Sequence, residues 1–139
     1  MAGNVNIDNY YRVVSIQGNV IHVEIKGFWD DRIIDQIGPE FLRLYENAIK
    51  QLHGKRFITL ADWSTCPVLG KKMIDYFSKA MLLVKRYNGH KVVEVIPKAL
   101  AQIGVKAAAE QTGKDDFRIV VTSLAEAQKA IEQLKQELS

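Results

Sequence analysis

The stretch "LADWSTCPVLGKK", residues 60–72, joins the two patterns that decide the fold. The run before it, "RFITLA" at 56–61, is short and rich in apolar residues, which predicts a buried strand. After it, apolar residues recur every three or four positions from Met73 to Val84, which predicts an amphipathic helix. A strand followed by a short connection and a helix is the unit of an α/β protein. We therefore predict that this stretch lies where a strand of a sheet turns into a helix.

The N-terminal third of the chain predicts a hairpin. Residues 10–17 and 20–28 have strand patterns, and the Gly18-Asn19 pair between them is a tight-turn signal. The second of these segments alternates apolar and polar side chains, which is typical of a strand with one wet face. The two segments therefore predict an antiparallel pair of strands.

A helix is predicted between the hairpin and the opening stretch. Apolar residues recur at helical spacing from Ile34 to Leu52, after an aspartate pair that can cap the helix. We expect the Gly38-Pro39 pair to break or kink this helix, because proline cannot donate the backbone hydrogen bond of a helix interior.

Further elements are predicted downstream. They are a strand at 91–96, an Ala-rich helix at 98–111, a strand at 116–123 and a terminal helix at 124–138 that begins at a capping box. The predicted order is ββαβαβαβα. It indicates one α/β domain over residues 1–139, with 1–9 as a loose arm, a mixed and mostly parallel sheet that begins with the antiparallel hairpin, and helices covering the sheet.

Composition is that of an ordinary globular protein. Of 139 residues, 47% are hydrophobic and 25% charged, and no apolar run is long enough to cross a bilayer. The N-terminus lacks a signal-peptide pattern and a single cysteine allows no internal disulfide, so we expect a cytoplasmic protein. The net charge of +3 conceals a basic segment: residues 71–106 carry eight basic and two acidic residues. We interpret this segment as a solvated face and expect no nucleic-acid partner.

The pieces "YRVVSIQGNVIHVEIKGFW" (11–29), "GKRFITLADWS" (54–64) and "DFRIVVTSLAEAQKAIEQL" (116–134), in this order, resemble the STAS-like fold, in particular the SpoIIAA-like relatives of anti-sigma-factor antagonists. The resemblance extends from about Tyr10 to Leu138. It implies a regulatory module without enzymatic activity that binds a partner protein, or in related branches a nucleotide or lipid-like ligand.

This sequence differs from the family in the segment that carries the switch serine. In the anti-sigma-factor antagonists it lies in an Asp-Ser-Ser-Gly segment at the start of the helix after the third strand. Aligning "CPVLG" on that segment matches Gly70, but puts Pro67 at the aspartate and Val68 and Leu69 at the two hydroxyls. The resemblance therefore does not extend to phosphorylation at these positions.

The strand-end stretch is the candidate binding site. In an open α/β sheet, ligands bind beyond the carboxyl ends of the strands, and a helix start exposes unpaired N–H groups that favour an anion. We expect a protein partner or a small anionic ligand there, no cofactor, no metal and no catalytic residue; a homodimer is also plausible. The candidate binding residues are Asp62, Trp63, Ser64, Thr65, Cys66, Gly70, Lys71 and Lys72.

Individual residues of this stretch have structural interpretations too. Asp62 can accept backbone N–H groups of the loop, and Trp63 can cover the end of the sheet with its N–H in water. Lys71 and Lys72 oppose the helix dipole unless an anion is bound. The three histidines have no metal-ligand spacing, and we interpret them as surface residues.

Two alternative functions remain. Cys66 before a helix is similar to the active-site turn of thioredoxin-like proteins, where a helix N-terminus lowers the thiol pKa, although no second cysteine follows. The segment "YFSKAMLLVKRYNGHK", residues 76–91, is amphipathic and basic, so the second alternative is a module that binds lipid or a membrane surface.

Overall fold

The structure is a computed structural model that describes residues 6–66, 70–96 and 117–138. Its centre is one five-stranded sheet in which the strands lie in chain order. The first two strands are antiparallel and every later pair is parallel, which confirms the predicted mixed sheet. The strands are β1 (Tyr11–Gln17), β2 (Val20–Lys26), β3 (Ile58–Thr65), β4 (Lys91–Val95) and β5 (Arg118–Val121).

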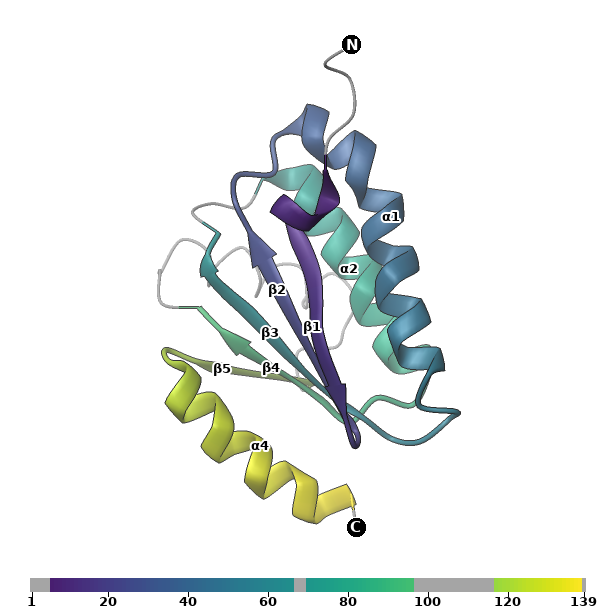
Figure 1. Cartoon of the computed structure of the whole chain (residues 1–139), viewed down its shortest axis with the longest axis vertical. Helices are drawn as coiled ribbons and strands as arrows, with labels where there is room; N and C mark the ends of the chain where they lie inside the picture. The colour runs from purple at the N-terminus through teal and green to yellow at the C-terminus, as the bar shows by residue number, and fades with distance from the viewer. Residues whose placement is uncertain (1–5, 67–69, 97–116, 139) are drawn as a thin grey trace.

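Helices cover both faces of this sheet (Figure 1). Helices α1 (Asp31–Lys50) and α2 (Lys71–Arg86) pack side by side on one face, and α4 (Leu124–Leu138) lies on the other, against β3, β4 and β5. A 3-10 turn (Ile7–Asn9) precedes β1, and Ile7 packs against the core. The Ala-rich helix expected at 98–111 lies outside the described residues.

Local sequence signals place several of the boundaries as predicted. Gly18 has a φ of +59°, which the tight turn of the hairpin requires. The Asp30 carboxylate accepts the N–H of Ile33 at 2.8 Å and so caps α1. Asn88 has a φ of +63° just after α2, which is the left-handed helix end that an Asn-Gly pair favours.

The break that was one of the two outcomes predicted at Gly38-Pro39 is absent, because α1 continues through both residues. Gly38 is buried under the ring of Tyr76 on α2, and a Cβ at Gly38 would lie 2.5 Å from the Tyr76 Cζ. This glycine therefore allows the two helices to approach closely. Packing against α2 offsets the hydrogen bond that Pro39 cannot make, which is a tertiary effect that local propensity does not contain.

The strand after α1 is longer than predicted. Residues 62–65 were expected in a loop, but β3 extends to Thr65 because it stays paired with β2, where Lys26 lies opposite Thr65 after a bulge. Side chains of β3 alternate between the two faces of the sheet. Trp63 belongs to the cluster under α1 and α2, whereas Leu60 belongs to the cluster under α4.

Candidate functional site

Strands β2 and β3 end side by side, and we call this end of the sheet an edge; α1 follows β2 in the chain and α2 follows β3 (Figure 1). We call five residues there the strand-end edge: Phe28, Ser64, Thr65, Gly70 and Lys71. Parallel strands β2 and β3 both point their carboxyl ends at this edge, which is where ligands bind in open α/β sheets. Of the predicted site residues, Ser64 and Thr65 lie at the end of β3, and Gly70 and Lys71 lie at the start of α2.

A turn after β2 presents an aromatic side chain at this edge. Gly27 has a φ of +72°, and a Cβ there would lie 3.3 Å from the ring of Tyr10. The turn directs the two aromatic residues that follow to opposite environments. Phe28 is 53% exposed, whereas Trp29 is buried and donates its Nε1–H to the Lys26 carbonyl at 2.8 Å. Phe28 was missed from the sequence, because two adjacent aromatics do not reveal which one points outward.

The end of β3 carries two exposed hydroxyls beside a buried carboxylate. The Asp62 carboxylate accepts the backbone N–H of Ser64 at 3.0 Å and also the Ser64 hydroxyl, which confirms its predicted part in holding the local backbone. Asp62 is only 9% exposed. Ser64 and Thr65 are exposed. A partner at this edge therefore meets the hydroxyls rather than the carboxylate.

Two residues of the predicted site are part of the core instead. Trp63 is buried and its ring lies 4.5 Å from that of Phe77, centroid to centroid. Its N–H is buried too, so the expectation that water would reach it at the surface is wrong. Cys66 is 1% exposed, and α2 begins five residues later, at Lys71. The thiol therefore has neither the solvent access nor the position at a helix start that the redox alternative requires.

One of the two lysines at the start of α2 forms an ion pair with a carboxylate. Gly70 is the exposed N-cap residue and provides no side-chain cap for the helix. Lys72 Nζ lies 3.1 Å from Asp35 Oδ1 on α1, and this hydrogen bond raises the pKa of Lys72. Lys71 is exposed. Lys72 is therefore paired at the surface with Asp35, which the sequence did not single out, whereas Lys71 is exposed.

The histidines have different environments. His53 is exposed, but His90 is 9% exposed and its Nε2 lies 2.6 Å from Glu137 Oε1 on α4. The surface interpretation is therefore wrong for His90, since only the tertiary structure brings residues 90 and 137 together. Among the described residues, no group of three or more histidine, cysteine or acidic side chains is placed to hold a metal ion.

Most of the amphipathic segment that suggested binding to a membrane surface lies on α2. Met73, Phe77, Met81 and Val84 are buried against the sheet and α1. Leu82 is 50% exposed on the outer side. None of the helices in the described part of the chain is both long and apolar enough to span a bilayer. The apolar stripe of α2 is thus occupied by the core and does not form a continuous surface face.

Two solved structures share this fold. One is the anti-sigma factor antagonist SpoIIAA in its unphosphorylated form, with a TM-score of 0.58, 11% identity and coverage of 91% of this chain and 96% of that one. The other is an anti-sigma factor antagonist from Mycobacterium paratuberculosis, with a TM-score of 0.56, 15% identity and coverage of 89% and 96%. No family model and no curated protein matches the chain. The chain therefore has a STAS-like fold, and at these identities the likeness concerns the fold alone.

Proposed function

We propose that the protein is a regulatory module without enzymatic activity that binds a partner protein through the strand-end edge. The observation that carries the proposal is Phe28, a large aromatic that is 53% exposed two residues after Lys26, which pairs with the exposed Thr65 at the end of β3. Aromatic side chains are enriched at the centres of protein interfaces, where burying one on binding is strongly favourable. Solved neighbours of the fold are anti-sigma factor antagonists, which supports a partner-binding role.

A protein partner fits this edge better than a small anion does. An anion at the start of α2 would need free cations, yet Lys72 is paired with Asp35 at 3.1 Å. Phe28 offers an apolar surface that a small anion cannot use. The exposed Ser64 and Thr65 hydroxyls can form the polar rim that surrounds an apolar contact in an interface.

Site-specific photocrosslinking in the native host tests the proposal. A benzophenone amino acid replaces Phe28, and in a matched control it replaces Leu82, which is 50% exposed on α2. We expect a discrete crosslinked product from position 28 that position 82 does not give. A product at the mass of two copies of this chain would identify a homodimer through the same edge. No product at 28, or the same products at both positions, would refute the proposal.

A substitution separates binding from folding. We expect Phe28→Ser to abolish the partner contact while changing the free energy of unfolding by less than about 0.5 kcal/mol, because an exposed side chain contributes little to the core. A titration with inorganic phosphate, followed by thermal stability, examines the small-anion alternative. A phosphate-dependent rise in stability that Lys71→Ala removes would favour that alternative over a protein partner.

A further inference from the structure

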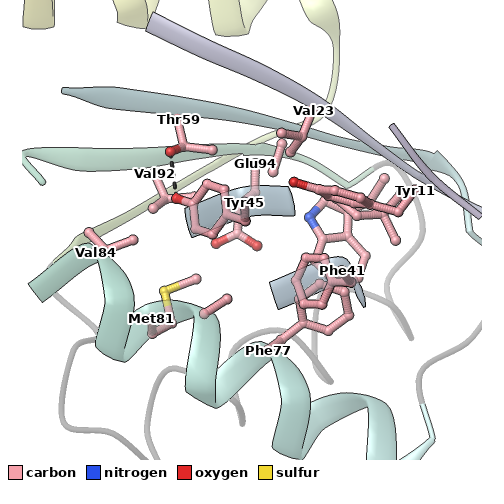
Figure 2. Close-up of a pocket in the computed structure, with 14 residues that line it drawn as sticks. Tyr11, Val23, Phe41, Tyr45, Thr59, Phe77, Met81, Val84, Val92 and Glu94 are labelled. Carbon is pink, nitrogen blue, oxygen red and sulfur yellow. Dashed lines mark hydrogen bonds between the residues drawn. The ribbon is translucent and has the colours of Figure 1, made fainter. Parts of the chain in front are cut away.

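Two hollows on opposite faces of the sheet differ in character. The one between the sheet and helices α1 and α2 has a volume of about 30 Å³, and its accessible wall is apolar (Figure 2). An apolar cavity that holds benzene needs roughly 150 Å³, so this cavity has no room for an organic ligand. The other hollow, of about 130 Å³, lies beside α4, and the larger part of its accessible wall is polar. We call it the α4 groove.

The α4 groove forms because α4 covers only part of its face of the sheet. Helix α4 packs against β3, β4 and β5, whereas β1 and β2 extend beyond it (Figure 1). Leu60 on β3 and Ile131 on α4 line the groove and belong to the aliphatic cluster under α4. Both are buried, so they form the floor of the groove. The walls are the uncovered part of the sheet on one side and α4 on the other.

A β-bulge decides which side chain of β1 lies in this wall. Val13 lies opposite Val23 on β2, and the register then shifts by one residue. Ser15 therefore lies opposite His22, in the place that uninterrupted pairing would give to Val14. The bulge thus puts a hydroxyl where the wall would otherwise be apolar, and it leaves Val14 37% exposed. Bulges are frequent beside functional sites, where they redirect a side chain.

Hydrogen-bonding side chains line both walls. Ser15, Gln17 and His22 come from the sheet. Gln128 and Lys135 come from α4, about two turns apart on one side of the helix. Ser15 and His22 are partly exposed, and the other three are exposed. The groove therefore offers a hydroxyl, two amides, an imidazole and an ammonium group to a ligand.

Charge gives the groove a preference for anions. Among the described residues that line it, only Lys135 carries a permanent charge, and none is acidic. Lys135 Nζ lies 3.4 Å from Glu132 Oε1, but the two side chains are 49% and 70% exposed, and such surface pairs contribute little. Glu24, two residues after His22 on β2, is held by Arg12 at 3.0 Å. Lys135 can therefore exchange its surface partner for an anionic group in the groove.

We propose that the α4 groove binds a small organic anion. A carboxylate or phosphate group of the ligand contacts Lys135, and the polar part of its body contacts Ser15, Gln17 and Gln128. An apolar floor with a few polar groups around it is the usual composition of a small-molecule site. A neighbouring hollow of about 490 Å³ shares Gln17 and Lys135 and extends to the hairpin turn at Gly18. It gives room to the part of the ligand that extends beyond the groove.

A nuclear magnetic resonance titration tests the proposal with inorganic phosphate, glutarate and neutral glucose, at constant pH and ionic strength. The ring C–H resonances of His22 report on the groove, and those of His53, which is exposed and does not line it, are the control. We expect phosphate, glutarate or both to shift His22 saturably and to leave His53 in place. The anion that binds identifies the anionic group as phosphate or carboxylate. No saturable shift from either anion, or an equal shift from glucose, would overturn the proposal.

Matched variants on α4 separate a site from a general effect of surface charge. Lys135→Gln should weaken anion binding about tenfold, which is the loss expected for one hydrogen bond to a charged group. Lys129→Gln removes another exposed lysine of α4 and should leave binding unchanged. Gln128→Trp fills the groove and should abolish the shift of His22, whereas Trp at the exposed position of Gln133, outside the groove, should not. Equal effects within either pair would refute the site.

These results are independent of the strand-end edge, since no residue of that edge lines the α4 groove. All four substituted positions on α4 are exposed, so each variant should keep the melting temperature of the wild type. Phosphate binding that Lys135→Gln weakens and Lys71→Ala leaves unchanged belongs to the α4 groove. The reverse pattern would place the anion at the start of α2 and would contradict the proposal.

Discussion

The two faces of the sheet are built from different chemistry. The face under α4 is a small aliphatic cluster made from Ile58, Leu60, Val93, Val95, Ala127, Ile131 and Leu134. The face under α1 and α2 is larger and aromatic, with Trp29, Phe41 and Phe77 in edge-on or tilted ring contacts. The second face also contains Glu94, which is fully buried on β4, and its partner Arg118.

This difference shows where the fold tolerates polar groups. The α4 cluster itself has only aliphatic side chains, so its contribution depends on packing, and the polar contact between His90 and Glu137 lies outside it. The α1/α2 face buries a carboxylate and a guanidinium, and such groups are costly to bury unless they are paired. The contribution of Glu94 and Arg118 should therefore depend on pH and on hydrogen bonding, whereas that of the aliphatic cluster should depend on its packing volume. Three predictions test this contrast.

The largest effect is expected from removing Arg118. Above pH 7, Arg118→Met leaves the Glu94 carboxylate buried without its ionic partner, and we expect a loss of about 3–5 kcal/mol in the free energy of unfolding. The matched control is Arg12→Met, which breaks an ion pair to Glu24 whose partners are 52% and 28% exposed. That loss should stay below about 1 kcal/mol. Urea denaturation measures both, and equal losses would show that burial of the ion pair does not matter.

The second effect is the pH dependence caused by Glu94. Its pKa is about 7 in the folded protein, mainly because of burial, and 4.5 is the ordinary value for the unfolded chain. A raised carboxyl pKa contributes stability below pH 4.5 that is lost as the pH rises through 7. Relative to Glu94→Gln, wild type should lose about 3 kcal/mol between pH 4 and pH 8. Measuring the free energy of unfolding of both proteins cancels the contributions of the other titratable groups. A difference between the two proteins that stays constant with pH would contradict the raised pKa of Glu94.

The smallest effect is expected on the aliphatic face. Ile131 on α4 is 2% exposed, and Ile131→Val removes one methylene from the cluster. We expect a loss of about 1 kcal/mol, with the same value at pH 4 and at pH 8. Chemical denaturation at the two pH values measures it. A loss that changes with pH would show that this face is coupled to the polar one, and the contrast between the faces would fail.

Much of the fold could be predicted because the signals are local. Strand alternation, helical spacing, the Asp30 cap and the Gly18 and Asn88 turns depend on residues close in sequence. Each element that they predict within the described residues is present, whereas the helix expected at 98–111 lies outside them. The mixed sheet followed from the order of the elements, since parallel neighbours need crossover connections. The same order gave the strand-end edge as the place for a binding site, which remains a proposal.

Predictions about individual side chains succeeded only where the partner was nearby in sequence. Asp62 holds the backbone of Ser64, two residues away, as predicted. The sequence did not predict that Phe28 is exposed or that Lys72 forms an ion pair with Asp35. Both depend on how α1 docks against the sheet and α2. A glycine before two aromatics was the available signal for an outward-pointing ring, but it does not identify which of the two is exposed.

The sequence by itself determined the order of the described elements and the buried side of helices α1 and α2, because periodicity encodes a buried face within a few residues. Only the tertiary structure decided that α1 continues through Pro39, that Trp63 points its N–H into the core and that Glu94 is buried beside Arg118. These outcomes depend on contacts between residues far apart in the chain. Their energies are set by packing and by the cost of unpaired polar groups, which no local pattern records.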